Sequence, residues 1–527
     1  MSAAQPDDSC PRLAELIAAL SLATDLGIGQ PMGYTLRVCL LALHLSGALG
    51  LSADELSEVY YVALLSGVGC TADAHESALL FGNDVTATAQ LATIDMASRR
   101  EMLNFLLRNA GAGKSPWRRL RMTATALSEG PAGAREPLAA HCESARMLAG
   151  QFGMSDGVSL GLSHIFERWD GHGWPYQLKG EASQRSARIV QLARDAVVFY
   201  RLGGVEAAVA VVRQRMSAKY DPHIAQSFCQ KAPHLLAATE SQSVWEAVLD
   251  GEPGAQPRMT DEQLDTGTQA IADFVDLKSP WLTGHSRGVA ELAAAAARRL
   301  GWQERAVSVV QRAGNLHDLG RVGISSGIWD KAGPLTDEEW EQVRLHSYYT
   351  ERVLSRPDAL ARLGSLAAGH HERLDGSGYH RHIPATLLSE GARLLAAADS
   401  YHAMIAARPH RPASTPEVAT ATLRDEVRQG RLDGDAVNAV LAAAGHNVQV
   451  AKRVWPAGLS EREVEVLRLV ARGLSRRQIG QQLCISEKTA DHHVQHIYTK
   501  CGVSTRASAT LFAMQHRLLS DLPALTE

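Results

Sequence analysis

Apolar residues recur at helical spacing along nearly the whole chain, and alternating runs of Val, Ile and Thr are few. This pattern predicts an all-α fold. Two Gly- and Pro-containing stretches, residues 250–258 and 445–458, interrupt the pattern and indicate connections between domains. We therefore predict two large helical domains, residues 10–240 and 259–445, and a small C-terminal module, residues 456–521.

The two large domains contain an internal repeat. Residues 33–70 align without a gap on 284–321 at an offset of 251, and residues 167–174 align on 372–379 at an offset of 205. Two matched blocks in the same order indicate a duplicated helical domain. The offsets differ by 46 (251 − 205), so the first copy carries that many extra residues between its blocks.

Composition narrows the class of protein. The 527 residues carry a net charge of −4, but residues 459–519 hold nine Lys and Arg against five Asp and Glu. A basic module on an acidic body is typical of a DNA-binding regulator. Seven scattered cysteines without a Cys-x-x-Cys pair indicate a reducing compartment. With no signal peptide and no long apolar run, we expect a cytoplasmic protein that does not enter a membrane.

The second copy concentrates residue types that bind metals. Its candidate ligands are five histidines and two aspartates: His285, His317, Asp318, His346, His370, His371 and Asp399. Imidazoles mixed with carboxylates suit iron or manganese better than magnesium, which prefers oxygen ligands. An aspartate can bridge two ions, and paired metals can hold a hydroxide against a phosphorus atom. The set suits a two-metal phosphohydrolase site. Any one of these histidines is more often a hydrogen-bonded core or surface residue than a ligand, so their order and the surrounding sequence must decide.

The strings His317-Asp318-Leu319-Gly320-Arg321 and His370-His371-Glu372-Arg373-Leu374-Asp375-Gly376-Ser377-Gly378-Tyr379 resemble the motifs of HD-GYP domains. This resemblance covers residues 277–445. It implies a metal-dependent phosphohydrolase that cleaves cyclic di-GMP or a related cyclic dinucleotide. It also implies that the seven candidate residues are the metal ligands, with Asp318 as the bridge and Arg321 assisting catalysis. The implied substrate-binding residues are Arg321, Gly378, Tyr379 and Arg408.

The sequence departs from the family pattern at four positions. Arg321 stands where the family has lysine, His380 where it has the proline of Gly-Tyr-Pro, and His402 where it has an acid. Trp281 takes the place of a glutamate that binds a third metal in some members, so two metals are expected. These changes leave two alternatives open: a non-catalytic nucleotide-sensing transcription factor, or a phosphohydrolase of another phosphorylated metabolite.

The first copy lacks this chemistry. The offsets place Ser66 at the position of His317, Tyr34 at that of His285 and Arg194 at that of Asp399. Ile165 and Phe166 replace the pair of adjacent histidines. Because these side chains cannot hold a divalent ion, we predict a degenerate HD-type domain with a role in packing, dimerisation or sensing.

The C-terminal module shows three helix starts. Ser460 with Glu463 and Ser475 with Gln478 form capping boxes, and Ser486 can cap a third helix after a short turn. Two helices joined by such a turn form a helix-turn-helix. A small dimerisation bundle would show the same amphipathic pattern.

The strings Leu459-Ser-Glu-Arg-Glu463, Ser486-Glu-Lys-Thr489 and Lys500-Cys-Gly-Val503 resemble the LuxR-type DNA-binding domain. The resemblance implies that the helix 487–500 enters the major groove and that the module binds paired half-sites as a homodimer. The implied DNA-binding residues are Lys488, Asp491, His492, Gln495 and Lys500. We therefore expect a signalling regulator in which a nucleotide controls the position of the DNA-reading helices.

Overall fold

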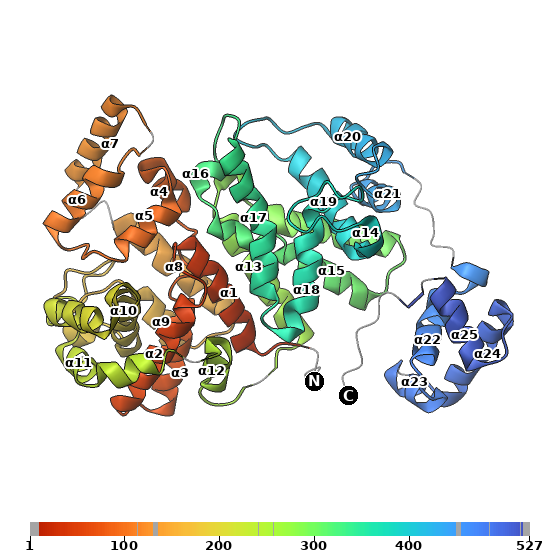
Figure 1. Cartoon of the computed structure of the whole chain (residues 1–527), viewed down its shortest axis with the longest axis horizontal. Helices are drawn as coiled ribbons and strands as arrows, with labels where there is room; N and C mark the ends of the chain where they lie inside the picture. The colour runs from red at the N-terminus through yellow and green to blue at the C-terminus, as the bar shows by residue number, and fades with distance from the viewer. Residues whose placement is uncertain are drawn as a thin grey trace. The chain divides into compact units, whose positions relative to one another are not determined.

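The computed structural model describes residues 10–112, 114–129, 135–240, 242–256, 258–448, 455–483, 485–516 and 518–519. Within these ranges the regular structure is helical, with only isolated β-bridges, as the sequence pattern predicts (Figure 1). The chain divides into two compact units, residues 1–450 and 451–527. Among the described helices, none has the length and apolar character that crossing a bilayer requires.

The first copy occupies the N-terminal half of the larger unit. Its helices are α1 (Leu13–Gly27), α2 (Tyr34–Ala48), α3 (Ala53–Leu65), α4 (Ala74–Phe81), α5 (Asp84–Leu91), α6 (Arg99–Asn109), α7 (Pro116–Glu129), α8 (Arg135–Gln151), α9 (Asp156–Ser163), η2 (Gly180–Ala182), α10 (Arg185–Arg215), α11 (Pro222–Ala237) and α12 (Val244–Asp250).

The second copy completes that unit. Its helices are α13 (Asp261–Asp276), η3 (Pro280–Leu282), α14 (His285–Arg299), α15 (Glu304–Leu316), η4 (Leu319–Gly323), α16 (Ser326–Trp329), α17 (Asp337–Leu354), α18 (Asp358–Ala368), η5 (Gly369–His371), η6 (Ala385–Leu387), α19 (Glu390–Ile405), α20 (Pro416–Arg428) and α21 (Gly434–Ala443).

Helix boundaries confirm the duplication. Helices α2 and α14, and likewise α3 and α15, begin and end at positions separated by the same 251 residues. The residues before α2 and α14, Gly33 and Gly284, both have left-handed backbones, with φ of 90° and 76°, a conformation that favours glycine. The second matched block also folds alike, because Glu167 accepts from the amide of Tyr176 and Glu372 from that of Arg381.

The extra residues of the first copy fall in the segment that forms helices α4 to α7. They have a small core of their own around Ala87, Phe105 and Leu106. Figure 1 shows α6 and α7 at the edge of the larger unit, away from the second copy. The insertion therefore leaves the duplicated helices intact.

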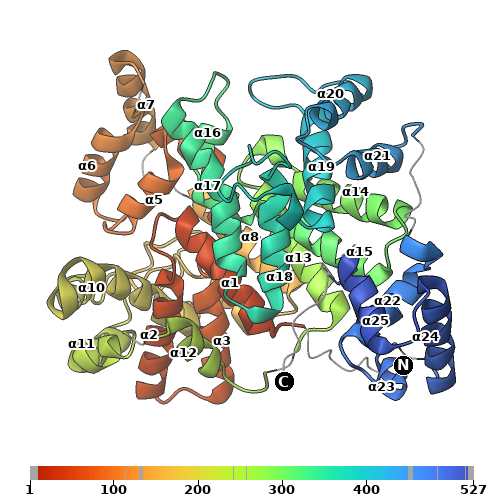
Figure 2. The ribbon, with the colours of Figure 1, turned by 45° about the vertical axis from the view of Figure 1, so that its right-hand side comes forward.

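The two copies are packed together rather than separated by an open linker. They share one continuous cluster of buried apolar residues, and α1 packs against η4 and α17 of the second copy (Figures 1 and 2). The connection is also anchored, since the Arg12 guanidinium lies 3.6 Å from the Glu252 carboxylate and the Met259 amide donates to the Pro11 carbonyl. The domains predicted as residues 10–240 and 259–445 thus lie in one compact unit.

The smaller unit contains η7 (Pro456–Gly458), α22 (Glu461–Ala471), α23 (Arg476–Gln482), α24 (Glu487–Cys501) and α25 (Arg506–Gln515). Both predicted capping boxes are present, and Ser486 accepts from the Thr489 amide at the start of α24. Helix α24 ends at Gly502, whose φ of 65° closes the helix. Helices α23 and α24 form the predicted helix-turn-helix; residue 484 of its turn lies outside the described residues.

Candidate functional site

The structure brings all seven candidate ligands together inside the second copy. Six of them are buried: His285 at the start of α14, His317 and Asp318 at the junction of α15 and η4, His346 on α17, His370 in η5 and Asp399 on α19. His371, also in η5, is partly exposed. Residues far apart in the sequence therefore form one inward-facing cluster.

Asp318 lies between two groups of histidines. Its Oδ2 is 3.6 Å from Nε2 of His285 and 3.1 Å from Nε2 of His317. Its Oδ1 is 3.6 Å from Nε2 of both His346 and His370. Each carboxylate oxygen thus faces a different pair of imidazoles.

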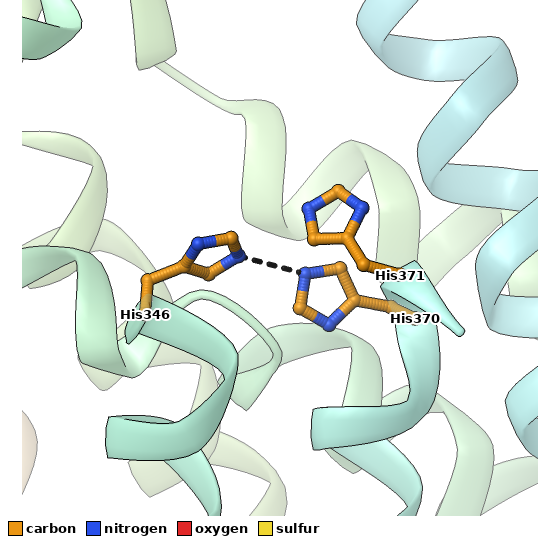
Figure 3. A group of neighbouring side chains, drawn as sticks. All are labelled: His346, His370 and His371. Atoms are coloured by element: carbon orange, nitrogen blue, oxygen red, sulfur yellow. Dashed lines mark hydrogen bonds between the residues drawn. The ribbon is translucent and has the colours of Figure 1, made fainter. Parts of the chain in front are cut away.

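Asp399 is the second carboxylate between the groups. Its Oδ1 lies 3.2 Å from Nε2 of His285, and its Oδ2 lies 3.9 Å from Nδ1 of His371. Figure 3 shows His346 from α17 facing the two η5 histidines, with Nε2 of His346 3.1 Å from Nε2 of His370. Three imidazoles therefore converge on one side of Asp318.

The donor atoms of this cluster fit bound cations. Five of them are buried without a hydrogen-bond partner: His285 Nε2, His317 Nε2, Asp318 Oδ1 and Oδ2, and Asp399 Oδ1. Three overlapping groups have ligand atoms within 4.8 Å of one another: His346, His370 and His371; His285, His317 and Asp399; His317, Asp318 and His370. Because unpartnered buried polar atoms are costly, their convergence indicates a metal site.

Protonation also favours metal binding. Burial lowers the pKa of His285 to about 3 and that of His346 to about 4, so both imidazoles are neutral. Burial alone would raise the pKa of Asp318, but Arg321 and the neighbouring His317 hold it well below its ordinary value. His317 differs from the other two histidines: burial would lower its pKa, but Asp318 and Asp399 raise it, so this ligand releases a proton when a metal binds. Neutral imidazole and ionised carboxylate are the forms that bind metals.

Arg321 is held beside the bridging carboxylate. Its Nε lies 2.8 Å from Asp318 Oδ2, and its guanidinium lies 4.7 Å from the centre of the Trp329 ring. The side chain is almost fully buried. This placement puts a permanent positive charge at the edge of the cluster.

The other predicted substrate-binding residues surround the same cluster. Nη2 of Arg408 is 3.5 Å from His285 Nδ1, and burial together with the charge of Arg321 lowers the pKa of Arg408 to about 10. The Tyr379 ring stacks on His371 at 4.3 Å. A Cβ at Gly378 would lie 2.5 Å from the Cα of Glu372, so the loop before Tyr379 has room only for glycine.

Two residues that depart from the family pattern, His402 and His380, contact other side chains in the structure. Nδ1 of His402 lies 3.0 Å from Nδ1 of His285. With Nε2 of His285 directed at the cluster, metal binding would require the proton on Nδ1, which would then donate to His402 and fix the orientation of the ligand ring. Nε2 of His380 lies 3.2 Å from Glu351 on α17, so this contact anchors the loop that follows Tyr379.

The first copy keeps one histidine that sequence analysis missed. His141 precedes His346 by 205 residues, the offset of the second repeat block. The carbonyls of these two histidines also occupy corresponding places beside Gly69 and Gly320. In the first copy Phe166 packs against the His141 ring, and Arg194 lies over Phe166. All three metal-binding groups found among the described residues lie in the second copy.

In the smaller unit the predicted DNA-binding residues fall into two sets. Lys488, His492 and Gln495 are exposed on α24. The other two have partners within the module: Asp491 lies 2.6 Å from Arg476, and Lys500 lies 2.7 Å from Glu463 and donates to the Gly458 carbonyl. Lys500 therefore ties the end of α24 to the start of α22.

Both units match models of known protein families. The HD domain model matches residues 269–436, and the model of bacterial regulatory proteins of the luxR family matches residues 457–513. The 3'3'-cGAMP-specific phosphodiesterase 3 of Vibrio cholerae is 31% identical over 419 residues, which cover 79% of this chain and 91% of that protein. The cyclic di-GMP phosphodiesterase response regulator RpfG of Xanthomonas campestris is 29% identical over 216 residues, covering 40% of this chain and 57% of its own length.

A solved structure agrees with these matches. The crystal structure of a cyclic GMP-AMP-specific phosphodiesterase of V. cholerae superposes with a TM-score of 0.59 at 28% identity, covering 83% of this chain and 98% of that one. These relatives confirm the predicted phosphohydrolase class of the second copy. The chain therefore belongs to the HD-GYP-type family of metal-dependent cyclic-dinucleotide phosphodiesterases and carries a luxR-type module after its duplicated HD region.

Proposed function

We propose that the second copy hydrolyses a phosphodiester bond of a cyclic dinucleotide, cyclic di-GMP or cyclic GMP-AMP, with two bound divalent ions, iron or manganese. The observation that carries this proposal is the position of Asp318, whose two oxygens face different pairs of buried histidines. The relative of which the chain covers 91% is named for cleaving 3'3'-cGAMP, which supports the substrate class.

Each group of ligands has a defined part in this proposal. His285, His317 and Asp399 would hold one ion, the three histidines His346, His370 and His371 would hold the other, and Asp318 would touch both. When bound, the ions supply Lewis-acid stabilisation and an activated water.

The remaining side chains act on the substrate or on the metal ligands. Arg321 offers a fixed guanidinium for the charge that develops on the phosphate, and its contact with Trp329 keeps it aimed at the cluster. Arg408 supplies a second cation beside His285. Tyr379 covers His371 and limits the access of water. His402, in contact with His285, orients a ligand ring.

Hydrolysis of named substrates tests this proposal. Manganese-loaded and iron-loaded protein is incubated with cyclic di-GMP and, separately, with 3'3'-cGAMP, and the products are separated chromatographically beside Asp318→Ala. We expect a metal-dependent linear product from the wild type and none from the variant. Intact substrate under both metals would overturn the proposal and favour a nucleotide sensor or another phosphorylated substrate.

The second unit supports a further proposal: the chain binds DNA as a homodimer in the cytoplasm, and nucleotide binding in the larger unit controls that binding. On α24, His492 and Gln495 are free to face base edges, and Lys488 can reach phosphates. Asp491 would accept from a cytosine amine only after exchanging its partner Arg476.

The DNA proposal is tested by selecting bound duplexes from a random-sequence pool and measuring the affinity of the selected duplexes by fluorescence anisotropy. We expect the wild type to enrich a paired half-site and the double variant His492→Ala/Gln495→Ala to lose that enrichment. A wild-type protein that enriches no sequence would contradict specific DNA binding. Sedimentation of the complex gives its oligomeric state.

A further inference from the structure

A cavity of about 400 Å³ lies beside the metal-ligand cluster. It is lined by Asp337, Trp340, Glu341, Arg344 and Tyr379. Tyr379 connects the two, because its ring lines the cavity and also stacks on the ligand His371 at 4.3 Å. Its size is in the range of cavities that bind small molecules, and its position makes it accessible to a substrate held at the cluster.

Four of the five lining residues come from one helix. Positions 337, 340, 341 and 344 lie on one face of α17, because residues three and four apart are neighbours on a helix. His346, a candidate ligand, lies on the same helix six residues beyond Trp340. Trp340 therefore lies about 9 Å along the α17 axis from His346, and Tyr379 joins the cavity to the cluster.

The fold does not require these side chains. Trp340 leaves 43% of its surface exposed, and the ion pair of Arg344 with Glu341 is exposed on both sides, so neither contributes much to stability. In the first copy, Arg135 lies six residues before His141, as Trp340 lies six residues before His346. Ala139 lies two residues before His141, as Arg344 lies two residues before His346. The duplicated helix without a metal site thus has a guanidinium where the indole would be and a methyl group where Arg344 would be, so it lacks this pairing of side chains.

The lining has the chemistry of a nucleobase site. An exposed indole offers a flat face on which a base can stack. A guanidinium pairs with the O6 and N7 acceptors of guanine. The carboxylates of Asp337 and Glu341 can accept from its N1–H and N2 amine. Adenine presents an amine where guanine has O6, and an amine cannot accept from an arginine.

We propose that this cavity binds one base of the cyclic dinucleotide and prefers guanine, with Trp340 stacking on the base and Arg344 reading its O6 and N7. This inference rests on the proposed hydrolysis of cyclic dinucleotides at the adjacent cluster. Trp340 and Arg344 are specificity-determining residues in this assignment. They contact the base and leave the phosphorus chemistry to the cluster.

The test compares Trp340→Ala and Arg344→Ala with two matched controls, Trp117→Ala on α7 and Arg352→Ala on α17. Both control side chains are exposed and lie outside the cavity. Two measurements are made on metal-loaded full-length protein: KM and kcat for cyclic di-GMP and cyclic di-AMP, and equilibrium dialysis of GMP and AMP. Thermal midpoints show that every variant is folded.

For Trp340→Ala we expect KM for cyclic di-GMP to rise roughly 5- to 150-fold, the loss of one stacked base, with kcat nearly unchanged. For Arg344→Ala we expect weaker binding of cyclic di-GMP and GMP, with cyclic di-AMP and AMP unaffected. Both controls should behave as the wild type.

Unchanged GMP binding in both cavity variants would overturn the base site, whether or not the enzyme is active, and in an active enzyme KM would then be unchanged too. Dialysis distinguishes this failure from failure of the proposed function. A wild type that cleaves no cyclic dinucleotide but binds GMP better than AMP, and loses that preference in Arg344→Ala, would support the base site and overturn only the hydrolysis. A wild type that neither cleaves these substrates nor retains GMP would overturn both.

Discussion

The buried ion pair between Asp84 and Lys278 joins the two copies, and its removal should destabilise the larger unit. Lys278 Nζ lies 2.5 Å from Asp84 Oδ2, and the two side chains are 1% and 4% exposed. Asp84 Oδ1 also accepts from the Ser325 hydroxyl at 2.7 Å and from the Ser326 amide at 2.8 Å. One carboxylate of α5 in the first copy thus satisfies three donors of the second.

Replacement of Asp84 by alanine leaves the Lys278 ammonium buried and unpaired. Breaking a buried pair from one side costs about 3–5 kcal/mol, and the unsatisfied Ser326 amide adds to this loss. We therefore expect Asp84→Ala to lower the free energy of unfolding by at least that amount. Urea unfolding followed by tryptophan fluorescence measures the change.

Two controls separate the ion pair from general effects. The exposed pair of Arg298 with Glu304 is 52% and 72% exposed, so Glu304→Ala should leave the urea midpoint unchanged. The double variant Asp84→Leu/Lys278→Met removes both charges and should recover most of the lost stability. An Asp84→Ala midpoint equal to that of the wild type would refute the reasoning.

Three further predictions follow from the structure. Chelation should lower the thermal midpoint, and manganese should restore it, because the buried ligand atoms lose their partners; a midpoint indifferent to chelation would contradict the metal site. Burial lowers the pKa of His141 to about 4 from 6.5, so as pH falls from 7 to 4 the unfolded state takes up a proton that the folded state does not. The stability advantage of wild type over His141→Gln, read from urea unfolding, should therefore shrink by about 3 kcal/mol over this range, and a difference constant with pH would oppose this. In the smaller unit, Lys488→Ala should reduce the salt dependence of DNA affinity by about one ion, whereas Lys500→Met should lower the thermal midpoint because Lys500 pairs with Glu463; the reverse pattern would contradict these roles.

Local sequence signals predicted much of this fold. The capping pair Ser460 and Glu463 predicted the start of α22, and the spacing of Gly33 and Gly284 predicted two copies of one helical pair. The seven candidate ligands were also found from the sequence, because residue type, order and the surrounding motifs together specify the set. Such signals are carried by residues close in the sequence or repeated at a fixed offset.

Contacts between distant segments have no such signal. Nothing in the sequence pairs Asp84 with Lys278, so the packing of the two copies on one core was not predicted. Trp340 looks like an ordinary surface residue of an amphipathic helix until the fold places Tyr379 beside it. Likewise, no local signal pairs Lys500 with Glu463, which lies 37 residues away; that Lys500 contacts DNA stays a prediction. These features depend on tertiary structure, which local pattern does not encode.

We propose that Asp318 joins two metal positions in one hydrolytic site. The most direct test measures turnover of cyclic di-GMP and 3'3'-cGAMP against the number of ions bound per chain, determined by mass spectrometry on the same samples. The account predicts that turnover rises with occupancy and saturates at two ions per chain, while Asp318→Asn binds fewer ions and forms no product. Linear product from metal-free protein, or no product at two bound ions, would contradict it.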